Sequence, residues 1–90
     1  MSFNLNNLKI IHLVGIGGSG MSSLARFFLS KNTRVSGTDA SDSKTLQELK
    51  NLGAKIFIGH ATENLPADAE CLIYTIAASN DNPEILAAKK

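Results

Sequence analysis

The chain has 90 residues, 43% of them hydrophobic and 19% charged, and a formal net charge of +1, values typical of one soluble globular domain. This near-neutral charge argues against a nucleic-acid partner or an anionic membrane surface. The single cysteine excludes an internal disulfide, and the first residues lack the pattern of a signal peptide, so we expect a cytoplasmic chain.

The first half of the chain alternates between short apolar runs and amphipathic segments. Residues 9–14, "KIIHLV", predict a strand buried on both faces, and a second strand is expected over residues 34–39. The helix between them is indicated by apolar residues at helical spacing, with Asn32 as a candidate left-handed cap. These residues are Met21, Leu24, Ala25, Phe28 and Leu29. A second helix is expected over residues 44–52, after the candidate caps in "SDS" and before Gly53.

The second half continues the alternation. Residues 54–59 and 70–77 predict two further strands, joined by a polar connection with a possible helical turn. Asn82 is placed to cap a third helix that has Pro83 at its first position. Because right-handed crossovers join parallel strands, this order predicts an α/β fold of three layers, with a parallel sheet of about four strands and helices on both faces.

The segment "GIGGSG" joins the first strand to the first helix and contains the pattern G-x-G-x-x-G. In this position Gly15 permits a tight turn, Gly17 lets a diphosphate approach the backbone, and Gly20 lets the helix pack closely on the strand. The N–H groups of residues 18–21 would face the anion at the helix N-terminus, and the Ser19 hydroxyl could donate to it. The alternative is a glycine turn that has only a structural role in packing.

Other polar residues are expected at the same edge of the sheet, where ligands of open α/β sheets bind. Asp39 ends the second strand and could accept from a ribose or a uracil ring, or else be a capping residue. His60 follows the third strand and could contact a phosphate or a sugar, or else be a solvated turn residue. Thr75 and Ala77 end the fourth strand and could line the cleft, or else be simply buried. His12 lies inside the first strand and is expected to be a core histidine with satisfied hydrogen bonds.

Several side chains are expected to have only structural roles. Cys71 is interpreted as a small core residue, and no Cys/His spacing indicates a metal site or a thiol nucleophile. Asp81 and Glu84 are expected to complement the dipole of the third helix. A solvated surface is expected for the acids Glu48, Glu63, Asp68 and Glu70. Since the chain also lacks a G-x-x-x-x-G-K-[ST] loop, it is interpreted as a binding domain without a catalytic residue or a cofactor of its own.

Four blocks of the sequence, taken together, carry a resemblance to a known family. "HLVGIGGSGMSSLA", "VSGTD", "LGAKIFIGH" and "DNPEI" resemble successive segments of the N-terminal domain of Mur ligases, over about residues 9–88. The resemblance implies a Rossmann-like domain that holds the UDP end of UDP-N-acetylmuramate in peptidoglycan precursor synthesis. It further implies a longer ligase, whose central domain binds ATP and Mg and activates the substrate carboxylate as an acyl phosphate. A C-terminal domain would help bind L-alanine, whose amine attacks the acyl carbon of that acyl phosphate. The products are the amide, ADP and phosphate.

Carried over residue by residue, the resemblance assigns a substrate-binding set that includes the glycine loop. The set is Gly15, Ile16, Gly17, Gly18, Ser19, Gly20, Met21, Asp39, His60, Thr75 and Ala77. The chain departs from the family's S-S-A-I at residues 75–78, where it has T-I-A-A, so Ile76 is left out of the set. A fifth strand of the family domain is expected beyond Lys90. A related ligase that recycles muropeptides, an NAD-dependent dehydrogenase and a nucleotide-sensing regulatory module are the alternatives.

Overall fold

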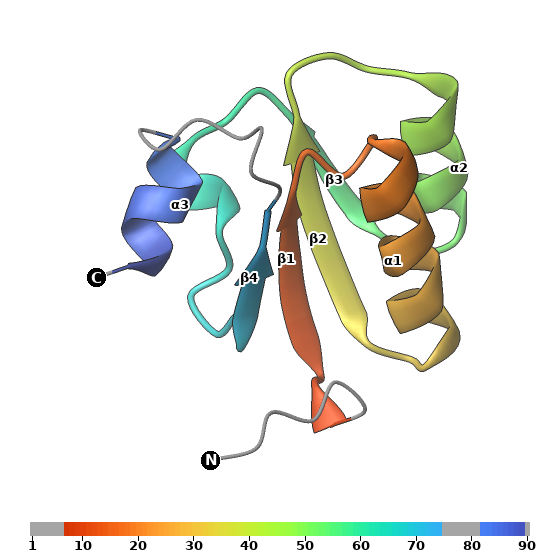
Figure 1. The fold of residues 1–90 in the computed structure, drawn as a ribbon, viewed down its shortest axis with the longest axis horizontal. Helices are drawn as coiled ribbons and strands as arrows, with labels where there is room; N and C mark the ends of the chain where they lie inside the picture. Colours follow the sequence, from red (N-terminus) through yellow and green to blue (C-terminus); the bar gives the residue numbers. More distant parts are fainter. Residues whose placement is uncertain (1–6, 75–81, 90) are drawn as a thin grey trace.

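Four parallel strands form the centre of the computed structural model, which describes residues 7–74 and 82–89. The strands are β1 (Ile10–Val14), β2 (Arg34–Asp39), β3 (Lys55–Ile58) and β4 (Cys71–Ile73), and their order in the sheet is β3-β2-β1-β4. Figure 1 shows β1 and β2 at the middle of the sheet. The predicted site residues Thr75 and Ala77 lie outside the described residues.

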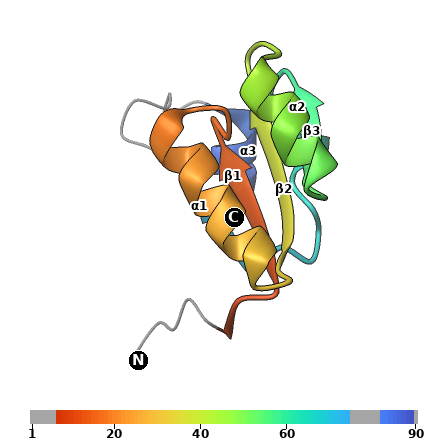
Figure 2. The same ribbon diagram turned by 90° about the vertical axis from the view of Figure 1, so that its right-hand side faces the viewer.

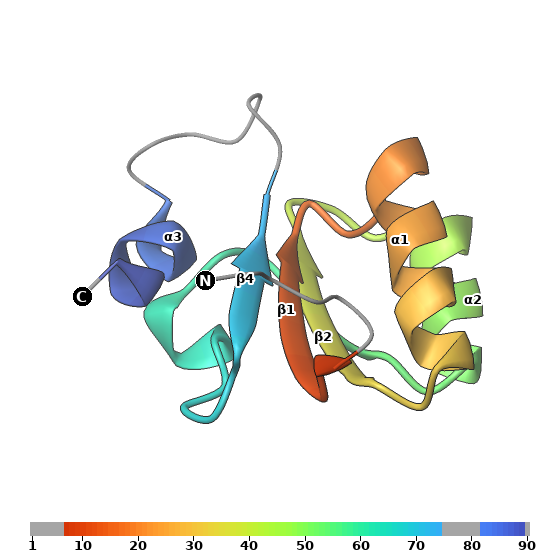
Figure 3. The same cartoon turned by 60° about the horizontal axis from the view of Figure 1, so that its bottom comes forward.

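Helices cover both faces of this sheet. Helices α1 (Ser19–Ser30) and α2 (Lys44–Asn51) pack side by side on one face, as Figure 2 shows. Helix α3 (Pro83–Ala88) and the short 3-10 helix η2 (Thr62–Asn64) lie on the other face (Figure 3). The predicted α/β fold of three layers is therefore confirmed.

The helix ends follow the predicted local signals. The Ser43 hydroxyl accepts a hydrogen bond from the Leu46 N–H (3.3 Å) and so caps the start of α2. Gly53 ends α2 with a φ of 110°, and Asn32 ends α1 with a φ of 63°. Both residues adopt the left-handed conformation that terminates helices, as expected.

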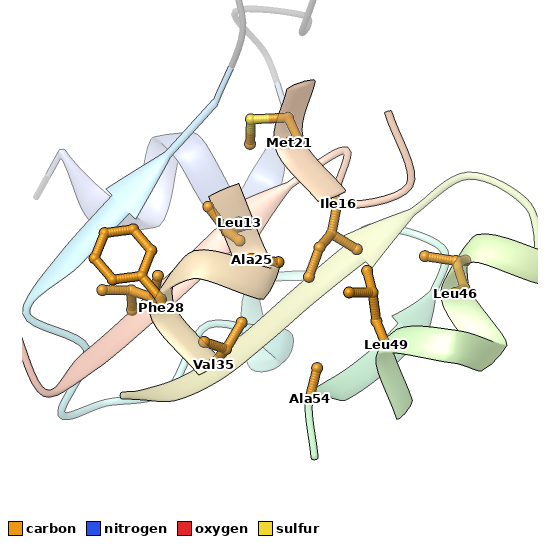
Figure 4. Packing of buried hydrophobic residues seen from close by; sticks show 10 residues of the cluster. Leu13, Ile16, Met21, Ala25, Phe28, Val35, Leu46, Leu49 and Ala54 are labelled. Atoms are coloured by element: carbon orange, nitrogen blue, oxygen red, sulfur yellow. The ribbon is translucent and has the colours of Figure 1, made fainter. Parts of the chain in front are cut away.

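The main hydrophobic core lies between the sheet and the pair of helices α1 and α2 (Figure 4). Of the apolar residues predicted to face the sheet from α1, Met21, Ala25 and Phe28 are buried in this core. Leu24 and Leu29 pack against it and are partly buried. Its buried members are Ile11, Leu13, Ile16, Met21, Ala25, Phe28, Val35, Leu46, Leu49 and Ala54. The core fixes the end of β1 against the start of α1, and this arrangement positions the glycine loop between them.

Strand β2 has the predicted bounds, whereas β1 and β3 are shorter than the sequence predicts. Among the strands in the described part of the chain, β3 pairs with β2 alone, and it is limited to the four residues that have partners there. At the start of β1, the Lys9 N–H donates to the Glu70 carboxylate (2.6 Å) instead of to a neighbouring strand. The described part of the predicted fourth strand is Cys71–Ile73, paired with β1.

Candidate functional site

Three segments meet at the carboxyl edge of the sheet. The Gly17 N–H donates to Asp39 Oδ2 (2.9 Å), which joins the loop after β1 to the end of β2. His60, after β3, lies with its Nδ1 atom 3.0 Å from Thr38 Oγ1. The structure thus brings together the glycine loop, Asp39 and His60, which the sequence predicted to share this edge.

Backbone hydrogen bonds hold the glycine loop to β2. The N–H groups of Gly15 and Ile16 both donate to the Thr38 carbonyl (2.8 and 3.0 Å), and the Gly18 N–H donates to the Gly15 carbonyl (3.1 Å). Gly15 has a φ of 78°, which confirms the predicted need for glycine at this tight turn. The loop is consequently anchored before any ligand binds.

The N-terminus of α1 faces the same edge with unused donors. Gly18 is the N-cap residue and provides no side-chain cap. Within the described residues, the N–H groups of Ser19, Gly20 and Met21 have no recorded acceptor, because helical bonding begins with the Ser22 N–H, which donates to the Gly18 carbonyl. Free N–H groups and the helix dipole together favour an anion at this point.

Gly17 lacks a side chain for a reason visible in the structure. A Cβ atom there would lie 2.7 Å from Asp39 Oδ2 and 3.3 Å from Leu46 Cδ2. The other oxygen of Asp39 accepts from the Ala40 N–H (2.8 Å). Since a carboxylate has about four acceptor positions, Asp39 keeps capacity for a ligand donor while it orders the loop.

The predicted packing role of Gly20 is wrong. A Cβ atom at Gly20 would meet nothing within 4 Å, because this residue lies on the exposed first turn of α1. The close approach occurs instead at Gly37 of β2, where a Cβ atom would lie 2.6 Å from Ile16 Cδ1. The side chains of Ile16 and Met21 are buried in the hydrophobic core and stabilise the fold. These two residues can therefore contact a ligand only through their backbone groups.

A buried carboxylate supports His60, and the sequence did not reveal it. Glu84 is 0% exposed, and its Oε1 atom accepts from His12 Nε2 (2.6 Å) and Thr38 Oγ1 (2.7 Å). Its Oε2 atom accepts from the Ala61 N–H (3.0 Å) and lies 3.3 Å from His60 Nδ1. Glu84 does lie in the first turn of α3, but the expectation that it only complements the helix dipole misses this network.

The environment keeps Glu84 ionised. Burial alone would raise the pKa of its carboxyl group, but the hydrogen bonds from His12, Thr38 and Ala61 outweigh burial and lower the pKa below its usual value of 4.5. His12 is the satisfied core histidine that the sequence predicted, with its Nδ1 atom 2.7 Å from Ser36 Oγ. A histidine inside a buried strand requires hydrogen-bond partners for its ring nitrogens. This requirement was the one signal in the sequence that could have predicted a buried acid such as Glu84.

The block "DNPEI" places Glu84 in the network. The Asn82 side chain accepts from the N–H groups of Glu84 (2.9 Å) and Ile85 (3.4 Å), and Pro83 occupies the first helical position, as predicted. The cap directs the first turn of α3 toward the sheet. Glu84 and Ile85 are buried there.

The remaining features fit structural roles. Cys71 packs against the core while only partly buried, and burial raises the pKa of its thiol, which disfavours a reactive thiolate. The four predicted surface acids are exposed, and two of them pair with Arg26 and Arg34. In the described ranges 7–74 and 82–89, no three potential ligands cluster into a metal site, and no helix could cross a membrane.

Two cavities lie away from the glycine loop. One of about 460 Å³ lies between η2, the start of β4 and the end of α3, and one of about 300 Å³ lies at the start of β1, β2 and β3. Both are therefore toward the amino ends of the strands. The glycine loop lies at the opposite, carboxyl edge of the sheet.

The order of these features along the chain agrees with its similarity to known proteins. Residues 10–90 match the model of the "Mur ligase family, catalytic domain". The chain belongs to the Mur ligase family. The blocks that suggested a resemblance to Mur ligases are the glycine loop, the strand that ends in Asp39, the segment before His60 and the cap of α3.

Curated relatives of this Mur ligase chain include two UDP-N-acetylmuramate–L-alanine ligases. The relative from Sulfurihydrogenibium sp. (strain YO3AOP1) is 48% identical over 83 residues, covering 92% of this chain and 18% of the relative. The relative from Clostridium botulinum (strain Langeland) is 47% identical over 92 residues, covering 100% of this chain and 20% of the relative. The chain thus spans about a fifth of their length.

Solved structures of Mur ligases have the same fold. The UDP-N-acetylmuramate:L-alanyl-gamma-D-glutamyl-meso-diaminopimelate ligase from Neisseria meningitides is 28% identical, with a TM-score of 0.77 over 90% of this chain and 25% of that one. A murein peptide ligase from Psychrobacter arcticus 273-4 is 23% identical, with a TM-score of 0.79 over 89% of this chain and 17% of that one.

Proposed function

We propose that this chain binds the UDP end of UDP-N-acetylmuramate, as the first part of an ATP-dependent ligase that adds L-alanine to it in cytoplasmic peptidoglycan precursor synthesis. The observation that carries the proposal is the anchored glycine loop at the N-terminus of α1, whose free N–H groups suit a diphosphate. The names of the curated relatives, which are 47–48% identical, supply the substrate.

Each part of the carboxyl edge has a role in this proposal. The N–H groups of residues 19–21 hold the diphosphate, since the Gly18 N–H already donates to the Gly15 carbonyl, and the Ser19 hydroxyl adds a donor. Asp39 accepts from the uridine, while its bond to the Gly17 N–H keeps the loop in place. His60 contacts the nucleoside or sugar. Thr75 and Ala77, which follow β4 in the sequence, complete the proposed lining of this edge.

The reacting groups are proposed to lie in the part of the ligase that this chain does not span. The sequence has no G-x-x-x-x-G-K-[ST] loop, the motif that holds the phosphates of ATP in P-loop enzymes. No chemical step is therefore assigned to this chain. It holds one end of the substrate so that the lactyl carboxylate reaches its own central domain, with the amino acid bound by the C-terminal domain.

A second candidate is the peptide-adding ligase, which the similarity to the Neisseria structure favours. The name of that enzyme also begins with UDP-N-acetylmuramate, so the site proposed here would serve either enzyme. The two candidates differ in the amine that is joined. Assays of the full ligase that contains this chain, with L-alanine or the tripeptide as amine, separate them.

Isothermal titration calorimetry of the 90-residue chain tests the proposed ligand. We expect binding of UDP-N-acetylmuramate and of UDP, and no binding of N-acetylmuramate alone, because the diphosphate and uridine carry the contacts. NADH also contains a diphosphate and is the matched control for nucleotide identity. Binding of NADH as tight as that of the UDP-sugar would favour the dehydrogenase alternative and refute the proposal.

A further inference from the structure

The hydrogen bonds around Glu84 determine which nitrogen of His60 carries the proton. Glu84 is fully buried and accepts from the Ala61 N–H, which can only donate, and from His12 Nε2. Its lowered pKa means that it is ionised and can only accept. The Thr38 hydroxyl, 2.7 Å from Glu84 Oε1, must therefore use its single proton on that carboxylate.

His60 has only acceptors around its Nδ1 atom as a result. Thr38 Oγ1 (3.0 Å) has already donated its proton, and Glu84 Oε2 (3.3 Å) has none. Nδ1 must donate to them. A neutral imidazole protonated at Nδ1 has an unprotonated Nε2 that accepts a hydrogen bond.

The second ring nitrogen of His60, Nε2, lies outside the hydrogen bonds around Glu84. No acceptor or donor for it is recorded among residues 7–74 and 82–89, and no buried polar side-chain atom in these ranges lacks a partner. Among these described residues Nε2 therefore has no partner, and it belongs to a side chain that is 26% exposed. A neutral acceptor at this position complements a hydroxyl or ring N–H and not a phosphate oxygen, which is itself an acceptor.

We infer that Glu84 is a positioning residue that holds His60 in the Nδ1–H form, so that Nε2 accepts a hydrogen bond from a donor on the nucleoside of the ligand. This inference rests on the proposed function only for the identity of the ligand. The proton position is a property of the free chain. Glu84 belongs to helix α3, which lies on one face of the sheet. In this way α3 supports a ligand contact at the carboxyl edge of the sheet.

Long-range ¹H–¹⁵N NMR of the imidazole rings tests the proton position without a ligand. At alkaline pH, where imidazole is neutral, we expect an unprotonated Nε2 for His60 in the wild type. In Glu84→Gln, the amide oxygen must face the Ala61 N–H. The NH₂ group then faces Thr38 Oγ1 and also His12 Nε2, which must give up its proton and accept. The Thr38 hydroxyl accepts from that NH₂ group and turns its proton toward His60 Nδ1. Because Thr38 Oγ1 (3.0 Å) is closer to Nδ1 than the amide oxygen at the Oε2 position (3.3 Å), the proton of His60 moves to Nε2.

Thr38→Val is the matched control, because it removes the Thr38 hydroxyl instead of turning its proton toward His60. Thr38→Val removes one acceptor but leaves Glu84 Oε2 near Nδ1, so the Nδ1–H form persists. Protonated Nε2 in the wild type, or an unchanged form in folded Glu84→Gln, would overturn the inference. If Glu84→Gln does not fold, the wild type and Thr38→Val still decide the matter.

Affinity for UDP tests whether Glu84 acts through His60. Loss of one hydrogen bond predicts that Glu84→Gln weakens UDP binding by about 2- to 10-fold. In a His60→Ala background, Glu84→Gln should have no further effect. An equal loss in both backgrounds would show a general structural role and overturn the inference.

Two analogues identify the donor on the nucleoside. One is UDP methylated at the ring nitrogen, and the other is UDP without the ribose 2′-hydroxyl. The analogue whose affinity no longer responds to His60→Ala lacks the donor, and sensitivity of both analogues would overturn the assignment to these groups. Failure of UDP to bind while His60 is in the Nδ1–H form would refute the proposed function alone.

Discussion

Gly17→Ala tests the contact between the glycine loop and Asp39. The new Cβ atom would lie 2.7 Å from Asp39 Oδ2 and displace the carboxylate from the Gly17 N–H. A hydrogen bond to a charged group contributes about 1.5–3 kcal/mol, and water replaces part of it because Asp39 is only partly buried. We therefore expect a loss of about 1–2 kcal/mol in the free energy of unfolding.

Urea and thermal denaturation followed by circular dichroism measure this loss. In a domain of this size, the loss corresponds to a fall in Tm of about 4–8 °C per kcal/mol. Gly20→Ala is the matched control, since its Cβ atom meets nothing within 4 Å and alanine stabilises an exposed helical position by about 0.5–1 kcal/mol. Equal stability of Gly17→Ala and the wild type, or an equal loss in Gly20→Ala, would refute the role given to Asp39.

Gly37→Ala places a Cβ atom 2.6 Å from Ile16 Cδ1 and 2.8 Å from the Leu13 carbonyl, and should lower the free energy of unfolding in urea by about 3 kcal/mol through overpacking. A change below about 0.5 kcal/mol would contradict that packing. Because the folded chain lowers the pKa of Glu84, its contribution to stability is complete above pH 4.5 and is lost as pH falls through the lowered pKa. Denaturation curves between about pH 7 and pH 3 should therefore show a loss that Glu84→Gln lacks, and identical pH profiles would contradict this. Asn82→Ala removes the cap of α3 and should cost about 1 kcal/mol, with faster amide hydrogen exchange in the first turn of α3, whereas unchanged exchange would argue against the cap.

Local signals predicted much of the fold. Ser43 and Asn82 cap helices through their own side chains, and Asn32 and Gly53 end helices because they tolerate a positive φ. These preferences act over a few residues and can be recognised in the sequence. Strand ends were less predictable because they depend on which neighbour each strand has. Strand β3 extends only as far as its pairing with β2.

The site was predictable in position but not in its internal bonding. The order of strands and loops placed Asp39 and His60 at the edge with the glycine loop. The role of Glu84 depends on α3 packing against the sheet near His12. Glu84 and His12 are 72 residues apart in the chain, so no local pattern reveals their contact. The glycine that permits close packing is likewise set by a contact in the fold. It is Gly37, because the Ile16 side chain lies directly against it.

The central claim is that the free N–H groups at the start of α1 hold the diphosphate. A ¹H–¹⁵N correlation titration of the 90-residue chain with UDP-N-acetylmuramate tests it most directly. The predicted result is that the largest amide shifts fall on residues 17–21, with smaller shifts at Asp39 and His60. Shifts centred on the cavity at the opposite edge, around Leu72 and Ala87, with no change in the loop would contradict the claim.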